Sequence, residues 1–182
     1  MNKLKSVFVL SMFSALFLAC NQSATTNSTA TTKDIGERNT SVPFTNVVMK
    51  DPIIHGAYKN YINLKNSLVA SNIELAQKSA SDLSGSLSKI DGCENTASIA
   101  TKIANSQNLK DQRTHFTTLS ADFIALLKHA DVKEGTLYVQ YCPMANSGKG
   151  GSWLASSSEI NNPYYGDEML NCGEVKETIT SK

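Results

Sequence analysis

The sequence predicts a mainly α-helical protein, an antiparallel four-helix bundle with a small C-terminal irregular or β subdomain. In four successive segments apolar residues recur every three or four positions, and helix-capping residues mark where segments begin. The joints between segments are short, which favours antiparallel neighbours. After Gly135 the pattern changes to β-branched and aromatic residues, so the bundle is expected to end there.

The chain begins with the pattern of a secretory signal. A short basic region precedes the apolar run of residues 7–18, which is too short to span a membrane as a helix. Ala19 stands directly before Cys20, an arrangement that resembles the lipobox of bacterial lipoproteins. We therefore expect removal of residues 1–19, lipid on Cys20, and attachment to a membrane through acyl chains. The alternative is ordinary secretion with Cys20 unmodified.

Residues 20–41 are rich in Ser, Thr and Asn, and they predict a flexible tether to a single following domain. The whole chain has 17 basic and 16 acidic residues. Removing residues 1–19 deletes two lysines and no acids, so the expected mature net charge is 15 − 16 = −1. This nearly neutral composition argues against a nucleic-acid-binding protein, which would carry a basic stripe. Export would place the cysteines where disulfides persist.

Capping residues predict where the first two helices begin. Asp51 before Pro52 predicts the first helix, which should end near Ala70. Ser71 and Glu74 have the spacing of a capping box and predict the start of the second helix. The expected apolar faces are Ile54, Tyr58, Tyr61, Leu64 and Leu68 in the first helix, and Leu75 or Ala76 with Ala80, Leu83, Leu87 and Ile90 in the second.

A break at residues 91–93 separates the first two helices from the next two. The third helix is expected over residues 94–105, where two isoleucines stand at helical spacing. The fourth is expected over residues 111–129, with the broad apolar face of Phe116, Leu119, Phe123, Ile124, Leu126 and Leu127. The helical bundle is therefore assigned to residues 42–135.

Residues 136–182 form the predicted C-terminal subdomain, which should pack on the bundle. Its first six residues alternate in character and predict a strand, whereas the small polar residues 145–151 predict a loop. Asn162 could cap a short helix that stops at Gly173. From Glu174 onwards the chain is either a last strand or a frayed tail.

Two pairs of sulfur-containing residues mark this subdomain: Cys142 with Met144, and Met169 with Cys172. Thiolates and thioethers prefer monovalent copper and other soft metals to hard cations. If the second segment is helical, Met169 and Cys172 lie three residues apart on one face and point the same way. Trp153 could lie over such a metal site, because the face of its ring attracts cations.

The same cysteines allow a second interpretation, a disulfide between Cys142 and Cys172 with both methionines in the core. Closing a loop of this size would contribute roughly 3 kcal/mol, and exported proteins form such bonds readily. Cys93 could pair with either cysteine instead, because connectivity cannot be read from a sequence. The two states can also alternate, with an oxidised pair at rest and a reduced pair that binds metal.

No motif predicts an enzyme. Residues 148–152 contain Gly-Lys-Gly but lack the spacing of a phosphate-binding loop. A nucleophile such as Cys142 and a base such as His115 can be named, but no motif places them together. A lone histidine on a bundle helix is more often a hydrogen-bonding residue than a ligand.

Several segments resemble a known family over residues 54–175. They are residues 55–58 and 64–69 in the first helix, residues 113–116 with Leu119 and Ser120 in the fourth, the run 138–144, and then Gly150, residues 152–154, Ile160, residues 162–164, Gly166, Met169, Leu170, Cys172 and Gly173. Together they resemble exported bacterial domains of unknown function. These domains occur alone as small lipoproteins and also fused to adaptor subunits of copper/silver efflux systems, membrane-fusion proteins of the CusB type.

This resemblance implies a non-enzymatic lipoprotein, exported and anchored in the envelope of a Gram-negative bacterium, facing the periplasm or the cell surface. It implies binding of copper, in the monovalent state, or of another soft metal, and an accessory role in metal efflux or homeostasis beside a metal efflux complex. The expected ligands are Cys142, Met144, Met169 and Cys172, with Trp153 and His55 beside them. The alternative function is a structural or partner-binding lipoprotein with the two cysteines in a disulfide.

After Met144 the chain differs from a related metal-binding signature. Residues 141–144 are similar to the heavy-metal-binding signature of copper pumps, in which His-Pro follows the methionine. Ala145 and Asn146 stand in those places here. A metal site in this chain would therefore need donors other than a local imidazole.

Overall fold

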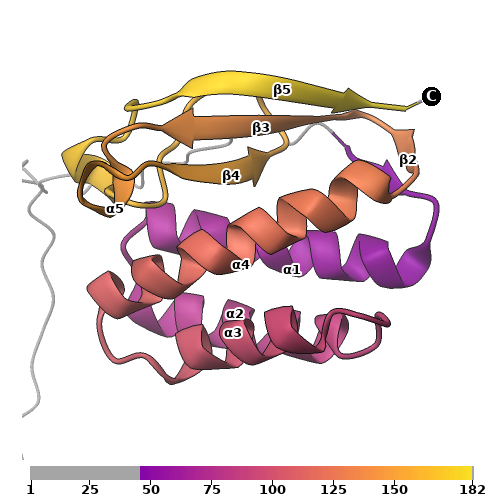
Figure 1. The fold of residues 1–182 in the computed structure, drawn as a ribbon, viewed down its shortest axis with the longest axis horizontal. Coiled ribbons are helices and arrows are strands. Elements are labelled where there is room, and N and C mark those ends of the chain that lie inside the picture. The colour runs from indigo at the N-terminus through magenta and orange to yellow at the C-terminus, as the bar shows by residue number, and fades with distance from the viewer. Residues whose placement is uncertain (1–45, 182) are drawn as a thin grey trace, which may run out of the picture. The chain divides into compact units, whose positions relative to one another are not determined.

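The computed structural model describes residues 46–181 (Figure 1). The expected signal sequence, the lipidated Cys20 and the tether lie outside the described residues. In chain order the elements are β1 (Val48–Met49), α1 (Pro52–Val69), α2 (Ile73–Leu87), α3 (Glu94–Asn105), α4 (Leu109–His129), β2 (Val132–Glu134), β3 (Thr136–Cys142), α5 (Ala145–Gly148), β4 (Gly151–Ala155), η1 (Gly166–Glu168) and β5 (Glu174–Thr180). The four long helices confirm the mainly helical class.

Side chains cap three of these four helices, although not always the side chains that the sequence predicts. Asp51 caps α1 as expected. The capping box at Ser71 and Glu74 is wrong, because the cap of α2 is Asn72, whose Oδ1 accepts a hydrogen bond from Leu75 N at 2.9 Å. Ser71 has a left-handed conformation with a φ of 53°, so it turns the chain between the helices instead of starting α2.

Successive helices run in opposite directions and pack side by side in chain order (Figure 1). Tyr61 of α1 stacks on Phe123 of α4, with ring centroids 4.5 Å apart and an interplanar angle of 8°. Strand β4 also packs against α1 and α4. Because a sheet covers this side of the helix pair, a closed four-helix bundle is not confirmed.

A three-stranded antiparallel sheet follows the helices, in the order β4-β3-β5. It lies on one side of α1 and α4, and α2 and α3 lie on the other (Figure 1). The backbone amide of Leu154 in β4 donates to Tyr61 Oη at 3.0 Å, and the same oxygen lies 2.6 Å from Ser120 Oγ. One buried hydroxyl therefore joins α1, α4 and the sheet.

The sequence predicted β3. For the segment from Glu174 onwards it left open a strand or a frayed tail, and the structure has the edge strand β5 there. The sequence did not predict β4, which begins inside the expected loop, or the pairing of β1 with β2. The segment labelled α5 is a left-handed turn, with φ of 54° at Asn146 and 59° at Ser147. The short helix expected to run to Gly173 is wrong, because only the three residues of η1 are helical there.

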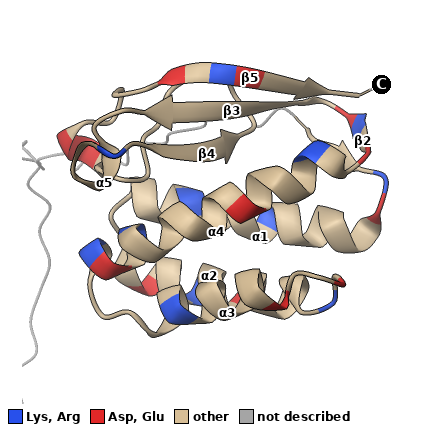
Figure 2. Cartoon of the chain, in the orientation of Figure 1, with Lys and Arg blue, Asp and Glu red and all other residues tan. Residues whose placement is uncertain are grey.

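The described surface carries both signs of charge. Basic and acidic residues are interspersed over the helices and along β5 in the view of Figure 2. No helix within residues 46–181 is long and apolar enough to cross a membrane.

Candidate functional site

The two sulfur-containing segments meet at one end of the sheet. Cys142 is the last residue of β3, and Cys172 lies in the turn just before β5. Their Sγ atoms are 2.8 Å apart, although the residues are separated by 30 positions in the chain. The antiparallel register explains this approach, because it pairs Tyr141 with Glu174, close to each cysteine. Strand pairing therefore brings the two thiols together.

The two thiols differ in their access to solvent. Cys142 is fully buried, whereas Cys172 is only half-buried. The hydrogen bond with the Cys142 thiol, together with burial, raises the pKa of the Cys172 thiol above its ordinary value. Cys172 must therefore lose its proton before its sulfur can bind a metal ion or attack a disulfide.

Cys93 is not part of this pair. It is a buried free thiol at the start of α3, and burial raises its pKa, with further contributions from Glu94 and Asp122. The structure thus brings together Cys142 and Cys172 and places Cys93 beside two carboxylates instead.

The two methionines flank the sulfur pair along the chain. Met169 directly follows η1 and is half-buried, and its carbonyl oxygen accepts a hydrogen bond from Cys172 N at 3.0 Å, so both residues share one turn. Met144 is 51% exposed, and its carbonyl oxygen accepts a 2.6 Å hydrogen bond from Tyr165 Oη. Met169 is therefore a residue of the Cys172 turn, and Met144, two residues after Cys142, is exposed.

Trp153 packs next to the turn that carries Cys172. Its side chain is fully buried, and a Cβ placed on Gly173 would lie 2.9 Å from the indole Cη2. The ring meets Tyr164 edge-on, with centroids 6.1 Å apart. Its Nε1 has no hydrogen-bond partner among the described residues. The indole thus supports the residue directly after Cys172.

His55 lies elsewhere. It is in the first turn of α1, and its Nδ1 accepts a 3.5 Å hydrogen bond from Met49 N. At about 1.5 Å per residue, roughly 21 Å of helix separates it from Val69, whose carbonyl lies against Gly166 of η1. The structure does not bring His55 to the sulfur pair.

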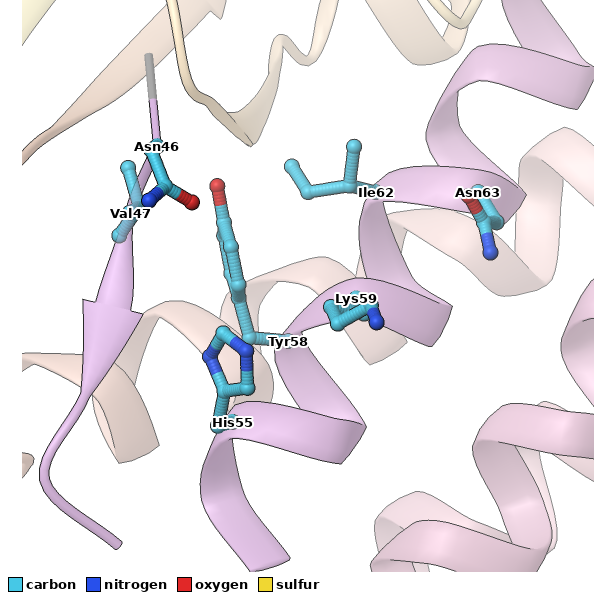
Figure 3. Close-up of a pocket in the computed structure, with 7 residues that line it drawn as sticks. All are labelled: Asn46, Val47, His55, Tyr58, Lys59, Ile62 and Asn63. Carbon is cyan, nitrogen blue, oxygen red and sulfur yellow. The ribbon is translucent and has the colours of Figure 1, made fainter. Parts of the chain in front are cut away.

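His55 instead faces a cavity of about 260 Å³, shown in Figure 3. Burial raises the pKa of the neighbouring Tyr58 to about 12. The residues that line this cavity are Asn46, Val47, His55, Tyr58, Lys59, Ile62 and Asn63.

Asn162 is a buried residue whose importance sequence reasoning missed. Its Nδ2 donates to the carbonyl oxygen of Cys172 at 2.8 Å, and its backbone amide donates to the carbonyl oxygen of Leu170 at 2.8 Å. Its Oδ1 accepts from Tyr164 N at 2.8 Å. An asparagine before a proline signals such a turn in the sequence, but the partner at Cys172 becomes visible only in the fold.

The sulfur pair offers two thiol donors to a metal ion. Within residues 46–181, no group of three or more His, Cys, Asp or Glu side chains is placed to hold a metal. Any further donor would be a thioether, a backbone group or a ligand from outside the described residues.

Residues 57–135 match a protein family described as a protein of unknown function (DUF3347). The match begins within α1 and ends just before β3, so the sulfur pair lies outside the matched residues. No curated protein and no solved structure matches the chain.

Proposed function

We propose that this chain binds monovalent copper or another soft metal ion through the thiolates of Cys142 and Cys172. The observation that carries the proposal is the 2.8 Å approach of two thiol sulfurs from distant segments of the chain. Met169, in the Cys172 turn, and the exposed Met144 supply thioether donors, which suit the same class of metal. In this role the protein binds the metal ion and catalyses no reaction.

The donor set fits a soft metal after a small adjustment. Two sulfurs bonded at about 2.3 Å to one tetrahedral ion lie roughly 3.8 Å apart. The thiols must therefore separate by about 1 Å on metal binding. Cys172 can move more readily than Cys142 because it is half-buried in a turn, whereas Cys142 is enclosed at the end of β3.

The cellular role rests on the sequence. The lipobox-like residues before Cys20 support export and a lipid anchor, and the resemblance to domains fused to efflux adaptors supports a role beside a metal efflux complex. The protein would hold the metal ion at the membrane surface, as a chaperone or buffer.

Anaerobic titration of the reduced protein with monovalent copper, against a chromogenic chelator, tests the metal site. Replacing Cys142 or Cys172 with Ser should weaken binding by about two orders of magnitude, because one of two thiolates is lost. Met169→Ala should have a smaller effect, and Cys93→Ser should have none. Equal affinity in the wild type and in Cys142→Ser would disprove the site.

A second candidate is a structural or partner-binding envelope lipoprotein in which the two cysteines form a disulfide. The 2.8 Å sulfur contact is closer to the disulfide bond length of about 2.05 Å than to the separation across a metal ion. Thiol titration of unreduced, denatured protein separates the two candidates. With Cys20→Ser, the disulfide form contains a single free thiol, and the reduced form contains three.

A further inference from the structure

We infer a further activity for the sulfur pair: thiol–disulfide exchange in a fixed order, in which Cys172 takes up an incoming disulfide and Cys142 resolves it. This covalent reaction goes beyond the proposed function and requires no bound metal. Its substrate is a disulfide in a small molecule or in an extended peptide.

The order follows from the difference in burial. A disulfide in solution must bring one sulfur atom into contact with the attacking thiolate. Cys142 is fully buried at the end of β3, whereas part of Cys172 is open to solvent. The first attack therefore comes from Cys172, which forms a mixed disulfide with the substrate.

The second step uses the close approach of the two sulfurs. In the mixed disulfide, the Cys172 sulfur still lies beside the Cys142 thiol, from which it is 2.8 Å away in the reduced protein. Cys142 attacks Cys172 Sγ and expels the remaining substrate thiol. Two electrons pass from the cysteine pair to the substrate disulfide, and the two protons of the cysteine thiols leave with the two substrate thiols.

The backbone at Cys172 and at Cys142 is held in place by contacts with other segments. Asn162 fixes the carbonyl oxygen of Cys172 by a 2.8 Å hydrogen bond. Gly173 has no room for a side chain, because a Cβ there would lie 2.9 Å from Trp153 Cη2 and 3.0 Å from the carbonyl oxygen of Tyr141. Pairing of β3 with β4 and β5 fixes Cys142. Closing the internal disulfide therefore needs side-chain rotation rather than movement of either strand.

Stoichiometric reaction of the full chain with 4,4′-dithiodipyridine tests the order. With Cys20→Ser and Cys93→Ser as background, the intact pair should release two thiopyridone molecules from one reagent molecule and end as an internal disulfide. Cys142→Ser should release one thiopyridone and keep a stable adduct on Cys172. Cys172→Ser should react at least about tenfold more slowly than Cys142→Ser, because a buried thiol is shielded from the reagent.

Two controls keep the result decisive. Cys172→Ala provides a second variant with Cys142 alone, and denatured samples of every variant should react equally fast. Equal rates for native Cys142→Ser and native Cys172→Ser would overturn the order, as would a lasting adduct on the intact pair. Exchange without copper binding would disprove only the metal proposal, and copper binding without exchange would disprove only this one.

Discussion

The side-chain amide of Asn162 donates a 2.8 Å hydrogen bond to the backbone carbonyl oxygen of Cys172. The other side-chain atom, Oδ1, accepts from Tyr164 N at the same distance. One buried side chain thus holds both the start of this loop and the turn that presents Cys172 to Cys142. The geometry of the sulfur pair depends on a residue that touches neither sulfur.

Replacing Asn162 with Ala should lower the free energy of unfolding by about 1–3 kcal/mol, because two buried backbone groups lose their partner. The same change should loosen Cys172 and speed its alkylation by iodoacetamide in the native protein. Denaturant unfolding and alkylation rates measure both effects. Asn171→Ala, which changes an exposed amide in the same turn, is the control and should alter neither.

Replacing Tyr61 with Phe should also destabilise the fold, by about 1–3 kcal/mol, because Leu154 N and Ser120 Oγ lose a buried partner. The double variant with Ser120→Ala should lose less than the sum of the single losses, since both changes remove one shared bond. Tyr138→Phe, in a half-buried position on β3, is the control. Strict additivity in urea unfolding would contradict the shared bond.

Two glycine substitutions should act in opposite directions. A Cβ on Gly151 would lie 2.6 Å from Tyr164 Cζ, so Gly151→Ala should cost about 1–3 kcal/mol by displacing that ring. Gly85 lies inside α2, and apart from the adjoining residues and backbone of that helix no atom lies within 4 Å of the position that an alanine methyl group would take there. Gly85→Ala should therefore stabilise the protein by about 0.5–1 kcal/mol. Thermal unfolding of the two variants checks both signs.

Because of Lys65, the free energy of unfolding should depend on pH in the alkaline range. Burial lowers its pKa from 10.5 to about 8 in the folded protein. Between these values the unfolded chain binds more protons, so the free energy of unfolding should rise with pH through this range. Below pH 8 the folded protein bears the cost of a buried ammonium, at most about 3 kcal/mol.

The matched test compares Lys65→Met with Lys59→Met, since Lys59 is exposed on the same helix. The Lys65 variant should be more stable than the wild type at pH 7, and its advantage should shrink by pH 9.5. The Lys59 variant should show little change at either pH. An advantage of Lys65→Met that stays constant across this range would rule out the titration of Lys65.

Local signals in the sequence predicted the helices well, because apolar spacing and caps are local. Asp51 caps α1 as expected, and α3 has the predicted bounds. The sheet was harder to predict, since β4 consists of Gly151–Ala155 after a glycine-rich turn and owes its strand form to pairing with β3. Ser71 and Asn72 are both residues that cap helices, and only the folded backbone shows that Asn72 is the cap, because Ser71 has a left-handed conformation.

The candidate site was predictable only as far as local sequence signals identify its residues. Sulfur chemistry and spacing identified Cys142 and Cys172, and the register of β3 with β5 then explains how they meet. The unequal burial of the two thiols and the support from Asn162 depend on contacts between distant segments. The separation of His55 from the two cysteines also depends on such contacts, because the last residue of α1, not its first turn, lies against η1.

Strand β5 bears on how the protein behaves when many copies are crowded together. It is one of the two outer strands of the sheet, and all of its residues except Ile179 are exposed. Its side chains include Glu174, Lys176 and Glu177, and charges on an outer strand oppose the addition of a strand from another molecule. Strand β5 thereby opposes edge-to-edge association of the sheets of two molecules.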